Sequence, residues 1–246
     1  MTENALRSSP APATADPEAP RVFQALQVGH ATFMGLDLLV APGVLVPREE
    51  TELLGHAARE ILAGAALPPA LLHLVDLCCG AGNLACALAS ASERVRAWAT
   101  DLTDSCVELA RQNVEHLGLG ERIRVAQGDL FAGLAGLGLE GTVDVVVCNP
   151  PYISTGRLET QLRGLLEKEP REAFDAGPYG LRIHQRVVKE ALPFLRPGGW
   201  LMFEVGVGQE RQVDMLFNRA GGYEPPQHRQ DAMGRVRVVL AQKKNG

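Results

Sequence analysis

The sequence lacks the features of several special classes of protein. No apolar run reaches the roughly 18 residues of a membrane span, and the amino end has no hydrophobic core of an export signal. The chain also has no excess of positive charge, since its formal net charge is −5, whereas a broad nucleic-acid footprint normally needs a basic surface. We therefore expect neither a membrane partner nor a nucleic-acid partner.

The five cysteines lack the spacing of metal ligands. They lie mostly inside hydrophobic patterns, at Cys78, Cys79, Cys86, Cys106 and Cys148. Reduced cysteines in the core of a cytoplasmic protein show this distribution. We therefore expect a cytoplasmic location and no metal site.

Length and composition indicate one α/β domain with appendages. With 246 residues, 46% hydrophobic and 22% charged, the chain is long enough to bury a full core. Residues 1–20 are rich in proline, alanine and serine and are expected to form a disordered leader. We expect a β-hairpin and linker over 21–46, with strands at 22–30 and 31–40, and the main domain over 47–246.

Four apolar segments of the main domain each end at a polar residue. They are 71–77, which contains Asp76, 95–100 before Asp101, 123–126 before Asp129, and 145–148 before Asn149. Helical patterns over 84–91 and 104–117 separate the first three, which is typical of parallel strands whose carboxyl ends meet at one edge. One such acid alone is more often a helix cap, but the set favours a ligand that contains adenosine.

The loop after the first strand is rich in glycine. Gly80 to Ala85 fits the pattern G-x-G-x-x-A, which is a weak indication by itself. A dinucleotide would place its pyrophosphate near Asp76, which would repel it. The carboxylate of Asp76 would instead attract an adenosine-containing ligand that carries a positively charged amino-acid end in place of a pyrophosphate.

The fourth strand continues into Asn149-Pro150-Pro151-Tyr152. Pro150 disfavours helix at the residue before it, so Asn149 is expected to be extended, and two prolines stiffen the loop. Tyr152 offers a flat face for a planar group. The alternative is a plain proline-rich turn after a core strand.

Together these residues resemble the class I methyltransferases that depend on S-adenosylmethionine. The resemblance is closest to the protein-(glutamine-N5) methyltransferases, which modify peptide release factors. It extends from about residue 22 to 241 and includes the segments 44–54, 169–181, 197–209 and 231–239. It implies a Rossmann-like α/β fold with a seven-stranded, mostly parallel sheet, helices on both faces and a small amino-terminal β-hairpin.

The resemblance also implies roles for particular residues. Asn149 and Pro150 would accept the two N–H groups of an amide as catalytic residues, and Tyr152 would hold its plane. Asp101 would bind the ribose and Asp129 would lie near the adenine. The full set for S-adenosylmethionine is Asp76, Cys78, Gly80, Gly82, Asp101, Leu102, Asp129, Leu130 and Asn149, and the set for the methyl acceptor is Arg48, Thr51 and Glu169.

The sequence departs from this family at three places. Cys78 replaces the first glycine of the loop, Glu49 replaces a usual proline, and only the leader and the hairpin precede Val44, where the family has a helical domain that helps hold the protein substrate. For this last reason we expect a small-molecule or carboxamide acceptor in natural product biosynthesis, or cyclisation of S-adenosylmethionine through its own amine.

Three alternatives stay open. They are N5-methylation of a glutamine in a protein such as a release factor, adenine N6-methylation of nucleic acid, and a catalytically silent binding module. The oligomeric state is not predicted.

The remaining segments are expected to support the site. Residues 153–176 are polar and mixed in charge, which predicts a lid or substrate loop. The helix starting after Pro47 is expected to run to about Ala63. An amphipathic helix is expected over 179–195, with His184 on its surface, followed by a strand at 200–205, a helix at 209–220 and a strand at 236–240.

Overall fold

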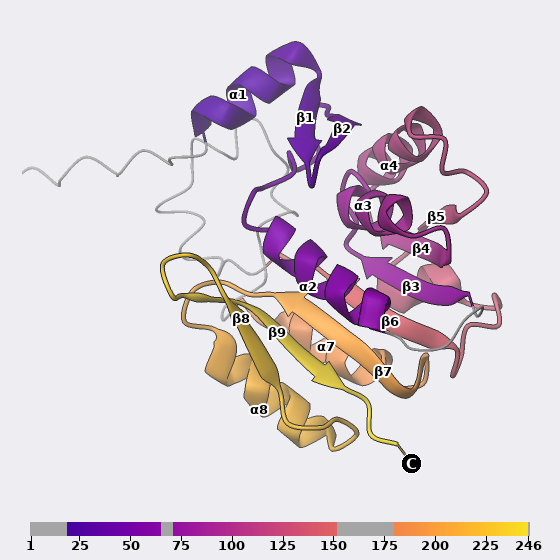
Figure 1. The fold of residues 1–246 in the computed structure, drawn as a ribbon, viewed down its shortest axis with the longest axis vertical. Coiled ribbons are helices and arrows are strands. Elements are labelled where there is room, and N and C mark those ends of the chain that lie inside the picture. The colour runs from indigo at the N-terminus through magenta and orange to yellow at the C-terminus, as the bar shows by residue number, and fades with distance from the viewer. Residues whose placement is uncertain (1–18, 65–70, 152–179, 246) are drawn as a thin grey trace, which may run out of the picture.

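The computed structural model describes residues 19–64, 71–151 and 180–245 (Figure 1). A seven-stranded sheet runs through it in the order β5-β4-β3-β6-β7-β9-β8. The strands are β3 (Leu72–Leu77), β4 (Val95–Asp101), β5 (Ile123–Gln127), β6 (Val143–Cys148), β7 (Leu195–Glu204), β8 (Gln227–Gln230) and β9 (Val236–Gln242). The strands β5, β4, β3, β6 and β7 pair in parallel, and β9 is antiparallel to both β7 and β8. The predicted mostly parallel sheet is therefore confirmed.

Helices cover both faces of this sheet (Figure 1). They are α2 (Glu52–Gly64), α3 (Asn83–Ala91) and α4 (Asp104–His116) on one face, and η1 (Leu130–Leu134), α7 (Arg182–Glu190) and α8 (Glu210–Ala220) on the other. Successive residues of β3 alternate between the two cores: Leu74 packs under the first group of helices and Val75 under the second. Asp76 therefore points towards α3. No helix within the described ranges is both long and apolar enough to cross a bilayer.

The order of the strands reverses between β3 and β6. The chain proceeds from β3 outward to β4 and β5, then returns to place β6 on the other side of β3. In open α/β sheets the crevice for a ligand lies at such a reversal, beyond the carboxyl ends of the strands. Here the register pairs Leu77 with Cys148, so the loops that follow these two residues leave the sheet side by side.

The amino-terminal region differs from the expected hairpin over 22–40. Its elements are α1 (Ala19–Val28), β1 (His30–Phe33) and β2 (Leu36–Leu39). Val22 and Ala25 lie three residues apart on one helical face and pack against Val40 and Val46. The strand prediction for 22–30 was wrong because it counted β-forming residues and gave too little weight to this helical spacing. The hairpin itself is confirmed over a shorter range.

Other boundaries shifted as well. The helix expected from Pro47 begins only at Glu52, so Arg48 and Thr51 lie in a turn in which the Thr51 amide donates to the Arg48 carbonyl at 3.2 Å. The strand β7 begins at Leu195, five residues before the predicted start, and β8 was not predicted. The expected loop 153–176 lies outside the described residues, as does the expected leader except for its last two residues.

The prediction that His184 lies on the surface was wrong. Its side chain is fully buried, its ring lies 4.9 Å from that of Phe203, and its Nε2 lies 3.3 Å from the backbone oxygen of Glu204. Burial lowers the pKa of His184 to about 4, so the imidazole is neutral at neutral pH. The packing of α7 against both α8 and the sheet covers a residue that the amphipathic pattern alone left exposed.

The turn after β5 gives the first testable prediction. A Cβ at Gly128 would lie 2.4 Å from the backbone of Gly133, whereas a Cβ at Gly120 would meet no atom within 4 Å. Gly128→Ala must therefore displace backbone, and we expect it to lower the free energy of unfolding by roughly 1–3 kcal/mol. The matched control, Gly120→Ala, should stay within about 0.5 kcal/mol of the parent. Chemical denaturation measures both, and equal effects of the two substitutions would contradict the close approach.

Candidate active site

The loop after β3 takes left-handed backbone conformations at three positions. The φ angle is +56° at Cys78, +53° at Gly80 and +77° at Gly82. Cys78 thus adopts a backbone conformation that favours glycine. A Cβ at Gly80 would meet open space, whereas one at Gly82 would lie 3.2 Å from the Cβ of Ala110 in α4. The backbone at Gly80 is therefore open to close approach by a ligand.

Asp101, at the end of β4, holds this loop in place. Its Oδ2 accepts a hydrogen bond from the Gly80 amide at 2.9 Å, and its Oδ1 accepts one from the Thr103 amide at 3.2 Å. The neighbouring Leu102 is 60% exposed. The structure therefore brings the predicted Asp101, Leu102 and Gly80 together at the carboxyl edge of the sheet.

Asp76 is a buried carboxyl group, and only one of its two oxygens has a hydrogen-bond partner among the described residues. Its Oδ2 accepts a hydrogen bond from the Ala85 amide in the first turn of α3 at 3.0 Å. Its Oδ1 is buried and has no hydrogen-bond partner among the described residues. Burial raises the pKa of Asp76 to about 7 because an ion is poorly solvated there. A cationic group of a ligand would satisfy this orphaned oxygen.

Asp129 occupies the predicted position after β5, but its carboxylate already has a partner. Arg186 of α7 donates to both of its oxygens, at 2.9 Å each. The next residue, Leu130, is buried with a φ of +55°, and its carbonyl accepts a hydrogen bond from the Thr100 hydroxyl at 3.1 Å. This ion pair with α7 was not foreseen from the sequence, because nothing local to either residue indicates it.

Asn113 is a further residue that the sequence analysis missed. It is fully buried in α4, where its Nδ2 donates to the carbonyls of Leu39 and Ala81, at 3.0 Å each, and its Oδ1 accepts from the Leu39 amide at 2.7 Å. One side chain thus joins the hairpin strand β2 to the glycine-rich loop. Its only signal in the sequence is an amide at an apolar position of the helix, between Ala110 and Val114.

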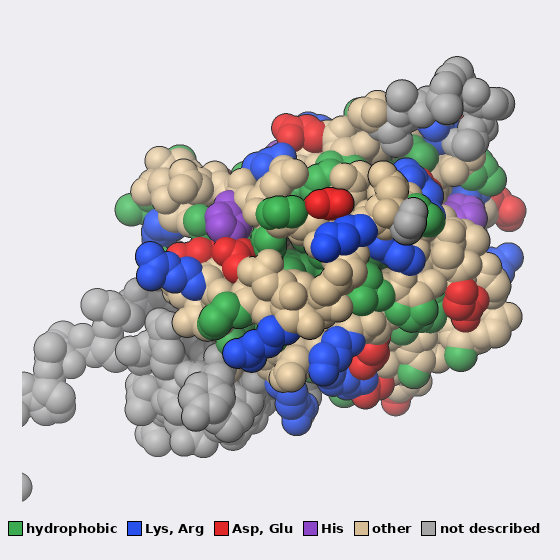
Figure 2. All heavy atoms as spheres, turned by 90° about the horizontal axis from the view of Figure 1, so that it is seen from below, with side chains coloured by type: hydrophobic (Ala, Val, Ile, Leu, Met, Phe, Trp, Pro, Cys, Tyr) green, Lys and Arg blue, Asp and Glu red, His purple; other side chains and the backbone are tan. Residues whose placement is uncertain are grey.

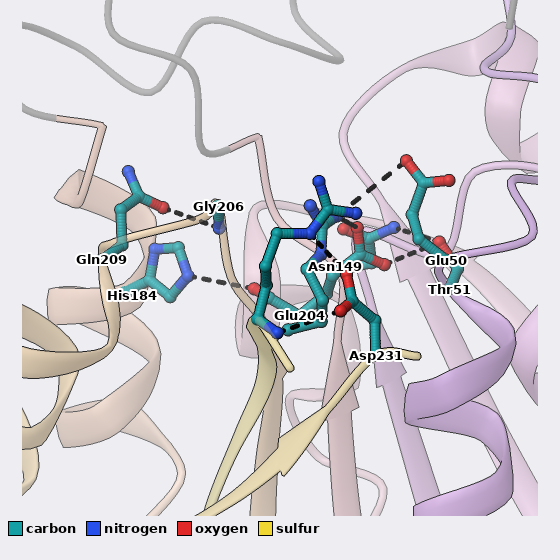
Figure 3. A network of polar contacts seen from close by, with 10 residues as sticks. Glu50, Thr51, Asn149, His184, Glu204, Gly206, Gln209 and Asp231 are labelled. Carbon is teal, nitrogen blue, oxygen red and sulfur yellow. Dashed lines mark hydrogen bonds and ion pairs between the residues drawn. The ribbon is translucent and has the colours of Figure 1, made fainter. Parts of the chain in front are cut away.

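Asn149 follows β6 and contacts Thr51, which in turn contacts Glu204 (Figure 3). Its Nδ2 donates to the Thr51 hydroxyl at 3.0 Å, and this hydroxyl donates to Oε2 of Glu204 at 2.6 Å. The other carboxylate oxygen of Glu204, Oε1, accepts from Nη2 of Arg237 at 3.2 Å. The structure therefore brings Thr51 and Asn149 together across 98 positions of sequence.

The other predicted residues divide into two groups. Pro150 and Arg48 are buried beside this site, with Arg48 8% exposed. Tyr152 and Glu169 lie outside the described residues.

One possible group of metal ligands occurs in the described part of the chain, formed by His30, Asp37 and His116 with ligand atoms within 4.8 Å of one another. It lies at the last turn of α4, at the other end of that helix from Asp101.

The site can be compared with known proteins. A family model described as "Methyltransferase small domain" matches residues 58–177. A release factor glutamine methyltransferase of Moorella thermoacetica is 39% identical over 213 residues, which cover 87% of this chain and 72% of that protein. One from Geobacter sulfurreducens is 37% identical over 79% of this chain and 64% of that protein. A human methyltransferase 10 domain containing protein superposes with a TM-score of 0.64, 20% identity and coverage of 92% of this chain and 96% of that one, and this supports the fold alone.

These comparisons confirm a methyltransferase but contradict the expected small-molecule acceptor. Both relatives are named for a glutamine of a release factor, and the similarity extends over most of this chain. The expectation failed because it counted contact area outside the main domain, whereas the residues expected to hold the reacting amide belong to the main domain itself. Natural product biosynthesis and cyclisation of S-adenosylmethionine are therefore set aside. On the face of the molecule that Figure 2 shows, basic and acidic side chains are mixed, so this face is not uniformly basic.

Replacement of Asp76 tests the electrostatics of the site. The pKa of Asp76 is about 7 in the folded protein against an ordinary 3.8, so between these pH values the folded state binds more protons than the unfolded one. The contribution of Asp76 to the free energy of unfolding therefore falls as the pH rises from about 4 to about 7. We expect Asp76→Asn to be more stable than the parent at pH 8 and to lose this advantage at pH 4, measured by denaturant unfolding. An advantage that is the same at both pH values would contradict the raised pKa.

Proposed function

We propose, because this chain belongs to the family of release factor glutamine methyltransferases, that it methylates the side-chain amide nitrogen of a glutamine in a release factor, with S-adenosylmethionine as the methyl donor. The observation that carries this proposal is the orientation of Asn149. Its Nδ2 is engaged by Thr51, so its Oδ1 is left to accept an N–H of an incoming amide. A carboxamide is a methyl acceptor whose two N–H groups can donate hydrogen bonds to such a site.

The residues of the glycine-rich loop fit S-adenosylmethionine. Oδ1 of Asp76, buried and without a partner among the described residues, would pair with the amino group of the methionine part. The open backbone at Gly80 would pass along it, Gly82 would let the loop turn closely against α4, and Asp101 would bind the ribose hydroxyls. When bound, S-adenosylmethionine supplies a methyl group attached to a positively charged sulfur. The further residues that we propose to line it are Cys78, Leu102, Asp129, Leu130 and Asn149.

The proposed chemistry depends mainly on positioning. An amide nitrogen is a poor nucleophile because its lone pair is delocalised into the carbonyl. Oδ1 of Asn149 and the carbonyl of Pro150 would accept its two N–H groups and so direct the lone pair towards the methyl group. Tyr152 would hold the amide plane, and Arg48 and Glu169 would contact the release factor. Such positioning and fixed dipoles contribute several kcal/mol. No strong base is needed, because the methylated nitrogen becomes acidic and loses its proton to solvent.

We also propose a cytoplasmic location. All five cysteines are free thiols, which is usual where the surroundings are reducing. Burial raises the pKa of Cys148 well above its ordinary value, so this thiol, which adjoins Asn149, stays protonated and unreactive.

Asp101→Ala tests the proposed donor site. It removes the acceptor for the ribose and also the acceptor for the Gly80 amide, so we expect the affinity for S-adenosylmethionine to fall at least about tenfold. Isothermal titration calorimetry measures this affinity. Asp104→Ala, which removes an exposed carboxylate in the first turn of α4, should leave it unchanged. Undiminished binding by the Asp101 variant would overturn the assignment.

The acceptor is tested by incubating the purified protein with S-adenosylmethionine and a release factor that carries its Gly-Gly-Gln loop. We expect mass spectrometry to find one methyl group on that glutamine, and none when the glutamine is replaced by asparagine. Asn149→Ala should lower kcat by roughly a hundredfold or more, because the substrate amide loses one of its two hydrogen-bond acceptors. The proposal fails if the parent protein leaves the glutamine unmodified.

A further inference from the structure

A chain of hydrogen bonds lies beside Asn149 and is assembled from four separate segments. Asn149 follows β6, Thr51 lies in the turn before α2, Glu204 ends β7 and Arg237 belongs to β9. Figure 3 shows the polar groups of Asn149, Thr51 and Glu204 pointing towards one another. Nη2 of Arg237 lies 3.2 Å from Oε1 of Glu204. Glu204 is 1% exposed and Thr51 is 2% exposed, so water does not compete for the contact between them. Within this chain of hydrogen bonds, Nδ2 is the atom of Asn149 that faces Thr51.

The direction of the chain follows from counting protons. A threonine hydroxyl has one proton to donate, whereas a carboxylate has none and can only accept. The contact of 2.6 Å between Thr51 Oγ1 and Glu204 Oε2 therefore uses the proton of Thr51. Towards Asn149 this hydroxyl can then only accept, so Asn149 must turn its NH2 group to Thr51 and its carbonyl oxygen away. Arg237 can only donate, so Oε1 of Glu204 must accept from it, and the positive charge of the guanidinium favours the negatively charged form of Glu204.

We propose that Thr51 and Glu204 are positioning residues that fix the orientation of the Asn149 amide, and that the negative charge of Glu204 sets the direction of the hydrogen bonds. This inference rests on the proposed function, because the orientation of Asn149 matters for activity only if an amide binds beside it. A reversed Asn149 would point its two N–H donors at the glutamine amide that is to be methylated, and this amide also offers N–H groups. Donors would then face donors, and the amide would not bind in a reactive position.

This mechanism predicts that Glu204→Gln reverses the chain with almost no change in shape. The guanidinium of Arg237 requires an acceptor, so the glutamine would turn its Oε1 to Arg237 and its Nε2 to Thr51. The Thr51 hydroxyl would accept from Nε2 and donate to Oδ1 of Asn149. The NH2 group of Asn149 would then point away from Thr51. A merely structural role for Glu204 predicts no such reversal.

The kinetic experiment compares Thr51→Val, Thr51→Ser and Glu204→Gln in the full chain with a release factor as substrate. For Thr51→Val and Glu204→Gln we expect kcat to fall at least about tenfold, while the dissociation constant for S-adenosylmethionine stays within about twofold of the parent. Thr51→Ser keeps the hydroxyl and should retain kcat within about threefold. A parental kcat in Thr51→Val, or a change confined to KM, would overturn the inference. Thermal unfolding identifies a variant that fails to fold, and the remaining variant then decides.

A second measurement does not depend on the reaction. Protein labelled with ¹⁵N at its asparagines gives side-chain NH2 signals, and the signal of Asn149 is assigned by its loss in Asn149→Asp. In the parent protein one of its two protons should exchange slowly with solvent because it is bonded to Thr51, and this protection should disappear in Thr51→Val and Glu204→Gln. Rapid exchange in the parent would overturn the inference even if the release factor is methylated. Protection in the parent without methylation of any release factor would overturn the proposed function alone.

Discussion

The parallel pairing of β3 with β6 is the contact on which the site depends. It aligns Leu77 with Cys148, and the residues that follow these two leave the sheet at one edge. Asp76 lies at the end of β3 and Gly80 in the loop that follows it, and the loop from β6 carries Asn149. Because the strand order reverses here, no further strand lies between the two loops. A donor on the first and an acceptor amide on the second would therefore meet without any large movement of the sheet.

Two buried carboxylates beside this crevice are stabilised in different ways. Glu204 is paired with a guanidinium and a hydroxyl. Asp76 has one amide partner, and its second oxygen has none among the described residues, so burial raises its pKa. A carboxylate with matched partners fixes a geometry, whereas one left partly unsatisfied favours a cationic ligand. The same functional group, a carboxylate, thus has matched partners at Glu204 and is left partly unsatisfied at Asp76.

Two polar side chains join the hairpin region to the rest of the domain, in addition to the apolar packing of Phe33 and Leu38 in the main core. Asn113 joins β2 to the glycine-rich loop, and Glu52 at the start of α2 accepts the Met34 amide at 2.7 Å. Met34 has a φ of +47°, so this bond helps hold the hairpin turn in a left-handed conformation. The segment before α2 therefore reaches both loops. Leu39 of β2 is joined to the glycine-rich loop by Asn113 of α4, and Thr51 contacts Asn149.

The sequence by itself determined the parallel sheet and the polar residues at its edge. A strand buried on both faces is rich in apolar residues, and the polar residues Asp101 and Asn149 stand at the carboxyl ends of two such strands. Only the tertiary structure decided the partners of these residues. The pairing of Asp129 with Arg186 and the support of Asn149 by Thr51 join segments 57 and 98 positions apart. No local pattern encodes such a contact, because it depends on how the helices and strands pack.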